Sequence, residues 1–157
     1  MNELAAEQID RCYHSTAVLL PDARVLSAGG GAYYLDENTP QQRQNDPQDT
    51  HRDAQIIRPP YLFKGVVQPA ITSASEFVNY QETFEVETGQ PDEIERVPWV
   101  RLSSVTHSSN TNQRFIELKH EIVGGNLRVS APTSANLCPP GHYMLFSPPP
   151  TREGAVR

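Results

Sequence analysis

Three side chains in this 157-residue sequence, Tyr13, His14 and His107, have types that suit metal or redox chemistry. Two imidazole nitrogens and a phenol oxygen are donors that suit Cu(II), which favours tetragonal sets of nitrogen and oxygen ligands. Zinc-binding patterns of the Cys-x-x-Cys and His-Glu-x-x-His kinds are absent from the sequence. By residue type alone an ordinary role stays open, because a Tyr-His pair at a strand start usually packs and a histidine in a polar loop is usually solvated.

His107 is positioned by two apolar runs, Trp99–Leu102 before it and Phe115–Leu118 after it, with a polar segment between them. Alternating apolar residues on both sides predict strand, loop and strand. We therefore expect His107 at the tip or shoulder of a long hairpin, from which its ring can reach beyond its own sheet.

Tyr13 and His14 open a β-rich run that reaches Leu20, and a second run covers residues 25–28. The Pro21-Asp22 pair between them predicts a hairpin, with Pro21 at the second position of a type I turn. An isolated hairpin is marginal in water, so this one needs a larger partner. The glycines at 29–31 then indicate a tightly packed strand end, since no Lys-Ser/Thr follows them as in a phosphate loop.

Residues 36–52 contain no apolar side chain and predict a long surface loop, because such a segment cannot offset its ordering entropy by burial. His51 and Asp53 near its end are expected to be solvated rather than to bind metal. A short strand follows and stops at Pro59-Pro60, where we place a domain boundary.

Beyond residue 64, short β-rich runs alternate with turn signals, which predicts an immunoglobulin-like sandwich. The expected strands are 70–74, 83–88, 94–97, 100–105, 114–118, 127–130 and 142–146. The proline-rich end of the chain is expected to fray.

Composition agrees with a loop-rich, all-β chain, since hydrophobic residues make up 37% and prolines number 14. The net charge of -6, without a stretch rich in Lys or Arg, argues against nucleic acid or an anionic membrane surface as a partner. No apolar run approaches a membrane span, and Met1–Leu4 lacks the features of a signal peptide. Cys12 and Cys138 have no metal-type spacing; one disulfide is possible, and two free thiols are favoured.

Four segments resemble, in order, the galactose oxidase and glyoxal oxidase family of copper-radical oxidases. They are Tyr13–Asp22, Asp53–Ile56 with Pro60–Leu62 after it, Val105–His107 continuing through Asn110–Arg114, and Pro140–Phe146. The resemblance runs from about residue 11 to residue 147. It implies a seven-bladed kelch propeller followed by an immunoglobulin-like, early-set β-sandwich, one hairpin of which enters the propeller channel. Residues 1–63 would be a remnant of the last kelch blade, 64–150 the sandwich, and 151–157 a tail.

The resemblance also implies a site. Tyr13 would be the axial copper ligand and the base that takes the substrate's hydroxyl proton, while His14 and His107 would be the equatorial imidazoles. The substrate would be a small alcohol, aldehyde or carbohydrate, with O2 reduced to hydrogen peroxide. In the family a second tyrosine, thioether-linked to a cysteine, holds a radical in earlier blades, and Cys12 does not match that cysteine. We therefore expect only part of the site here, with the missing blades upstream or in another chain.

One departure from the family pattern is Ala23, where the family usually has glycine. If that position needs a positive φ, alanine costs about 1 kcal/mol and the hairpin still forms. Two other hypotheses stay open: a non-catalytic sandwich module that binds carbohydrate or protein, and a truncated reading frame without independent function. Trp99, the single tryptophan, is expected in the core rather than on a sugar-binding surface. Members of the family are usually secreted.

Overall fold

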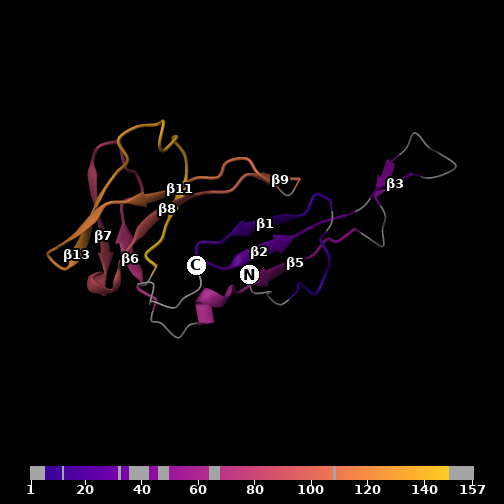
Figure 1. Ribbon diagram of the computed structural model, residues 1–157, viewed down its shortest axis with the longest axis horizontal. Helices are drawn as coiled ribbons and strands as arrows, with labels where there is room; N and C mark the ends of the chain where they lie inside the picture. The colour runs from indigo at the N-terminus through magenta and orange to yellow at the C-terminus, as the bar shows by residue number, and fades with distance from the viewer. Residues whose placement is uncertain are drawn as a thin grey trace. The chain divides into compact units, whose positions relative to one another are not determined.

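The computed structural model describes residues 6–11, 13–31, 33–35, 43–45, 50–63, 68–107 and 109–148 (Figure 1). Their regular structure consists of strands and two short 3-10 turns, η1 (Pro60–Phe63) and η2 (Pro91–Glu93), so the fold is all-β as predicted. Among these residues no helix has the length and apolar character needed to cross a bilayer. The chain forms two compact units, the first from Met1–Pro60 with Ser103–Thr111 and the second from Tyr61–Leu102 with Asn112–Arg157.

The first unit is built on an antiparallel sheet of three strands in the order β1-β2-β5. Its strands are β1 (Thr16–Leu19), β2 (Val25–Ala28) and β5 (Ala54–Ile57), which lie side by side in Figure 1. The predicted hairpin is therefore confirmed, and β5 is the short strand expected before the Pro-Pro break. Because β2 is the central strand, β1 and β5 are the two edges of this sheet.

The turn between β1 and β2 has the predicted form. The N–H of Ala23 donates to the carbonyl of Leu20 at 2.9 Å, which places Pro21 second in the turn. The N–H of Leu20 donates to the carbonyl of Arg24 at 2.8 Å and closes the loop. Ala23 has a φ of 63°, so this position does require the left-handed backbone that glycine adopts without cost.

The long loop expected over residues 36–52 is interrupted by a strand. β3 (Tyr33–Leu35) pairs antiparallel with β4 (Arg43–Asn45), so the prediction is wrong for residues 43–45. The sequence gives no signal for β4 because Arg43–Asn45 contains no apolar residue, and strand prediction relies on an apolar pattern. Residues 36–42 and 46–49 lie outside the described residues.

A hairpin at residues 103–111 belongs to the first unit, although the chain on both sides of it belongs to the second. We call this segment the finger. Its strands are β9 (Val105–Thr106) and β10 (Ser109–Asn110), and β9 lies against β1. The Ser104 carbonyl accepts hydrogen bonds from both the N–H and the hydroxyl of Thr111, which closes the base of the finger. His107 follows β9 directly, at the tip that the sequence predicts.

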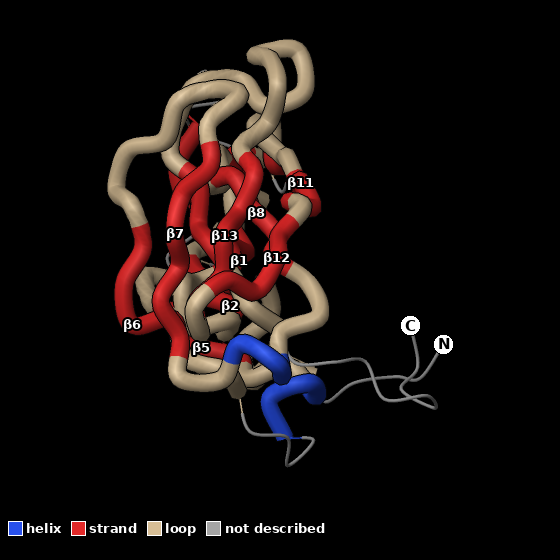
Figure 2. The backbone as a smooth tube through the Cα atoms, turned by 90° about the vertical axis from the view of Figure 1, so that its left-hand side faces the viewer, coloured by secondary structure: helices blue, strands red, loops and turns tan. Residues whose placement is uncertain are grey.

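The second unit contains two antiparallel sheets. The larger has the order β12-β13-β7-β6, and its strands can be followed side by side in Figure 2. They are β6 (Ile71–Ala74), β7 (Thr83–Thr88), β12 (His120–Val123) and β13 (Asn126–Ser130). The smaller has the order β11-β8-β14, with β8 (Val97–Arg101), β11 (Phe115–Leu118) and β14 (Tyr143–Leu145).

Two strand predictions in this unit are wrong. The expected strands 94–97 and 100–105 are replaced by the single strand β8, which continues through Pro98. Pro98 lacks an N–H, but its carbonyl accepts from the N–H of Phe146, just beyond the end of β14. The N and C=O of one strand residue point to the same side, so the missing N–H of Pro98 would also face β14. It falls beyond the last paired residue of β14, where the loss of one backbone hydrogen bond costs little. The sequence analysis also missed β12, whose Ile122 is 49% exposed and gives no clean alternation.

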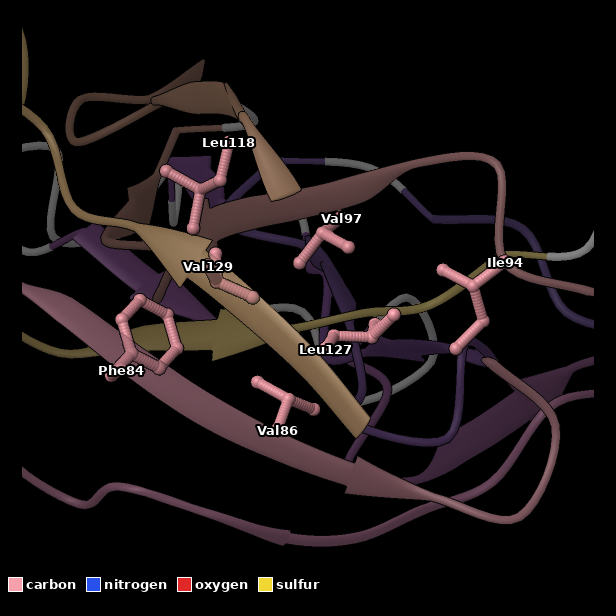
Figure 3. Close-up of a cluster of buried hydrophobic side chains, with 7 residues drawn as sticks. All are labelled: Phe84, Val86, Ile94, Val97, Leu118, Leu127 and Val129. Carbon is pink, nitrogen blue, oxygen red and sulfur yellow. The ribbon is translucent and has the colours of Figure 1, made fainter. Parts of the chain in front are cut away.

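The core lies between the two sheets (Figure 3). β7 alternates exposed and buried residues along its whole length, as a strand with one covered face must. The buried cluster contains side chains from both sheets and from the loop before β8, namely Phe84, Val86, Ile94, Val97, Leu118, Leu127 and Val129. Trp99 packs against this cluster as expected, with Phe84 and Tyr143 each at a ring-centroid distance of 5.6 Å.

The cysteine prediction is confirmed for one residue. Cys138 is buried and its thiol is free. Its carbonyl accepts a hydrogen bond from the Tyr80 hydroxyl at 2.6 Å, so this residue helps to hold the chain before β14. Cys12 lies outside the described residues.

The left-handed backbone at Ala23 gives a test of the hairpin. Ala23→Gly should raise the free energy of unfolding by about 1 kcal/mol, because glycine adopts this φ without steric cost. Ala17→Gly is the matched control: Ala17 lies in β1, where added backbone freedom should lower stability by about 0.5–1 kcal/mol. Urea denaturation of both variants measures the difference, and a loss of stability in Ala23→Gly would contradict the assignment.

Candidate metal centre

The structure brings together all three side chains that the sequence singled out. The ring centroids lie 3.9 Å apart for Tyr13 and His14, and 4.4 Å apart for His14 and His107. Tyr13 and His107 are separated by 5.3 Å in an edge-on arrangement. His14 and His107 are 93 residues apart in sequence, yet both belong to the first unit, because the finger is part of it.

The two imidazoles face each other through the same ring atom, with 2.9 Å between Nε2 of His14 and Nε2 of His107. Without a metal, one of these nitrogens must carry a proton and the other must accept it. Two imidazoles bound to one ion at about 2.0–2.1 Å and at a right angle would have nitrogens about 2.8–3.0 Å apart. The observed separation therefore fits adjacent positions in a tetragonal Cu(II) site, and the donor types fit that ion as well.

Both histidines have an unusual backbone, with a φ of 63° at His14 and 53° at His107. They are two of the four non-glycine residues with positive φ in the described part of the chain. This conformation is uncommon for residues with a side chain, although histidine tolerates it better than most. Such residues cluster at functional sites, because the surrounding structure must compensate for their cost. No sequence pattern predicted this feature.

The backbone of Tyr13 and His14 is held by the glycine segment that follows β2. The N–H of Gly31 donates to the carbonyl of Tyr13 at 2.9 Å. Gly29 has a φ of +68°, and a Cβ there would lie 3.7 Å from the carbonyl of His14. The positive φ of Gly29 is the backbone conformation that the glycines were expected to permit, and the Gly31 hydrogen bond links this strand end to Tyr13.

Arg11 is a supporting residue that the sequence analysis missed. Its side chain is only 8% exposed, and its guanidinium donates from Nη1 to the carbonyl of Gly29 at 2.9 Å. Nη2 lies 2.7 Å from a carboxylate oxygen of Asp53, and Nε lies 3.3 Å from one of Glu7. Glu7 also accepts from the buried Ser27 hydroxyl at 3.0 Å. The network joins the segment before the tyrosine to β2 and to the start of β5, a link between distant residues that no local motif reveals.

Two other titratable side chains of this unit, His51 and Asp53, have charged partners of their own. Nε2 of His51 lies 3.5 Å from a carboxylate oxygen of Asp10, and Asp53 pairs with Arg11. Within the described part of the chain, no group of three or more His, Cys, Asp or Glu side chains could hold a metal ion. His14 and His107 are exposed, and Tyr13 is 50% exposed. Two imidazoles and a phenol therefore form an open donor set that leaves room for further ligands.

Comparison with known proteins gives a consistent set of relatives. Residues 68–148 match the sequence family described as "Galactose oxidase-like, Early set domain". The chain is 33% identical to a galactose oxidase of Gibberella zeae over 88% of its own length and 19% of that protein. It is 31% identical to the aldehyde oxidase GLOX of Vitis pseudoreticulata over 88% of its length and 28% of that protein. A WSC domain-containing protein of Arthroderma benhamiae matches all of the chain at 29% identity.

Among solved structures, the chain resembles a fungal alcohol oxidase of the AA5 family determined in complex with copper. The TM-score is 0.71 at 31% identity, over 90% of this chain and 29% of that one. The chain thus spans between about a sixth and somewhat over a quarter of the length of these relatives.

The Arg11 network gives a test of how Tyr13 and His14 are held. Arg11→Lys keeps the charge but loses the planar fork that reaches Gly29, Asp53 and Glu7 together. We expect the Gly31 amide, which donates to Tyr13, to exchange with solvent faster by about one order of magnitude. Arg58→Lys, at an exposed site, is the control and should leave that amide unchanged. Equal exchange rates in the two variants, measured by NMR, would remove Arg11 from this role.

Proposed function

Because the chain belongs to the galactose oxidase-like family, with its early set domain over residues 68–148, we propose that Tyr13, His14 and His107 supply copper ligands in an alcohol or aldehyde oxidase. The observation that carries this proposal is the 2.9 Å approach of the two Nε2 atoms, with the Tyr13 ring beside both imidazoles. A pair of imidazoles that meets in this way, from segments far apart in sequence, is well placed to hold one ion.

The proposed reaction converts an alcohol and O2 into an aldehyde and hydrogen peroxide, so that two electrons and two protons leave the substrate. Bound copper would supply Lewis acidity and accept one of the two electrons. In our proposal His14 and His107 would hold the ion through their Nε2 atoms. The phenolate form of Tyr13 would take the hydroxyl proton of a substrate that lies within hydrogen-bond reach of its oxygen.

We further propose that this chain contributes part of the site and is not catalytically complete alone. A second redox group must take the other electron, and in the proposal it is a cross-linked tyrosine of propeller blades supplied from outside these residues. Residues 1–63 would then be the end of a kelch propeller and 64–150 the sandwich domain. The 50% exposure of Tyr13 supports this division, because further blades would cover it.

The position of the single tryptophan does not support the alternative of a carbohydrate-binding sandwich. Such a module stacks sugars on accessible aromatic faces, whereas Trp99 packs against the core between Phe84 and Tyr143.

Copper binding by the 157-residue chain tests the proposed ligands. Cu(II) added to the wild-type protein should give a tetragonal EPR spectrum with coupling to two nitrogens. His107→Asn should lose one nitrogen coupling while keeping the left-handed backbone, which asparagine tolerates. His142→Asn, in an exposed position of the second unit, should behave as wild type. A wild-type protein that takes up no copper at micromolar concentration would contradict a preformed imidazole pair.

The proposed incompleteness has its own test. The copper-loaded chain, supplied with primary alcohols and aldehydes in air, should produce no more hydrogen peroxide than free Cu(II) at the same concentration. A peroxide-coupled assay measures this directly, with a complete oxidase of the family as the positive control. Turnover that depends on Tyr13, abolished in Tyr13→Phe, would show instead that the chain contains a sufficient site.

A further inference from the structure

The finger carries a hydroxyl that contacts the second nitrogen of one candidate ligand. The Thr106 Oγ1 atom lies 2.8 Å from Nδ1 of His107, while Nε2 of the same ring faces His14. We propose that Thr106 is the positioning residue of His107, whose hydroxyl fixes the ring plane and aims Nε2 at the metal position. The inference rests on the proposed copper site and adds a residue that does not touch the ion.

The chemistry of imidazole explains why a hydroxyl suits this place. A neutral imidazole that offers Nε2 to a metal carries its proton on Nδ1, and that proton needs an acceptor. Partners of this kind orient histidine ligands and raise their affinity for metal. The Thr106 oxygen can accept from Nδ1–H, and so it stabilises the tautomer that leaves Nε2 of His107 free to bind.

In the metal-free chain, one of the two rings must carry a proton on Nε2 instead of Nδ1. The 2.9 Å contact between the Nε2 atoms requires that either His14 or His107 carries a proton there. When His107 carries it, Nδ1 becomes an acceptor, and the Thr106 hydroxyl can donate to it by rotating its hydrogen. A carboxylate could not donate in this way. The hydroxyl therefore serves both tautomers, and the ring need not move when the ion enters.

The backbone holds this hydroxyl in place. Thr106 pairs with Ser109 in the two-stranded ladder of the finger, and β9 lies against β1. A β-branched side chain has few χ1 rotamers, so a fixed backbone largely fixes Oγ1. The backbone of His107 has a φ of 53°, in the left-handed region, and its ring lies beside the Thr106 side chain.

Two variants separate the hydroxyl from the rest of the side chain. Thr106→Val keeps the shape and the β-branch but removes the hydrogen bond, whereas Thr106→Ser keeps the hydroxyl and removes the methyl. Titration calorimetry of the full chain with Cu(II) should show a dissociation constant raised about tenfold or more in the valine variant. In the serine variant it should return close to the wild-type value. Equal weakening in both variants, or in neither, would overturn the proposal.

A second measurement does not depend on copper. In the metal-free wild type and in Thr106→Ser, the Nδ1 15N shift of His107 should be the same at a pH where imidazole is neutral, because a hydroxyl is hydrogen-bonded to that nitrogen in both. In Thr106→Val this shift should move, because the hydrogen bond is lost. Unchanged shifts in the valine variant would overturn the positioning role, whatever the calorimetry shows. If wild type binds no copper, the proposed function fails at this site, and the 15N shifts still decide whether Thr106 orients the ring.

Discussion

The approach of His14 and His107 is the interaction on which the candidate site depends. It joins residues 93 positions apart, and it exists because the finger belongs to the first unit while its two ends belong to the second. Both histidines adopt a left-handed backbone that is unfavourable for most side chains. The hydrogen bond from Gly31 to the Tyr13 carbonyl and the contact of the Thr106 hydroxyl with the His107 ring are the local interactions beside these two positions.

The sandwich provides the base of the finger. β8 and β11 pair over four residues, and the N–H of Arg101 donates to the carbonyl of Arg114 just beyond that ladder. Val97 of β8 and Leu118 of β11 are buried in the core at the opposite end of the same pair of strands. Hydrophobic burial at one end thus anchors two strands whose continuation carries a polar hairpin. Neither the length nor the exposure of that hairpin weakens the core, because its own residues contribute nothing to it.

Sequence reasoning succeeded where local physics decides the outcome. The alternation of β7 and the Pro21-Asp22 turn each follow from residues that are neighbours in the chain, and both are present as predicted. It failed where partners are distant or where the backbone is unusual. One ion pair of Arg11 involves Asp53, which lies beyond the next four strands, and nothing in the sequence shows that His14 and His107 have positive φ. The sequence predicts two strands around Pro98, because a proline usually ends a central strand. β8 continues through it, since the missing N–H of Pro98 falls at the end of the β8–β14 ladder.

The finger has a consequence for how this protein can be divided and inherited. A cut near residue 63, which follows the composition of the chain, would leave His14 on one piece and His107 on the other. Neither piece would then retain the imidazole pair, even if each kept its own strands intact. Recombination that exchanged residues 64–150 for another domain of similar shape would remove His107, one of the two facing imidazoles. The candidate site therefore requires that the two units are inherited together, although their cores are separate.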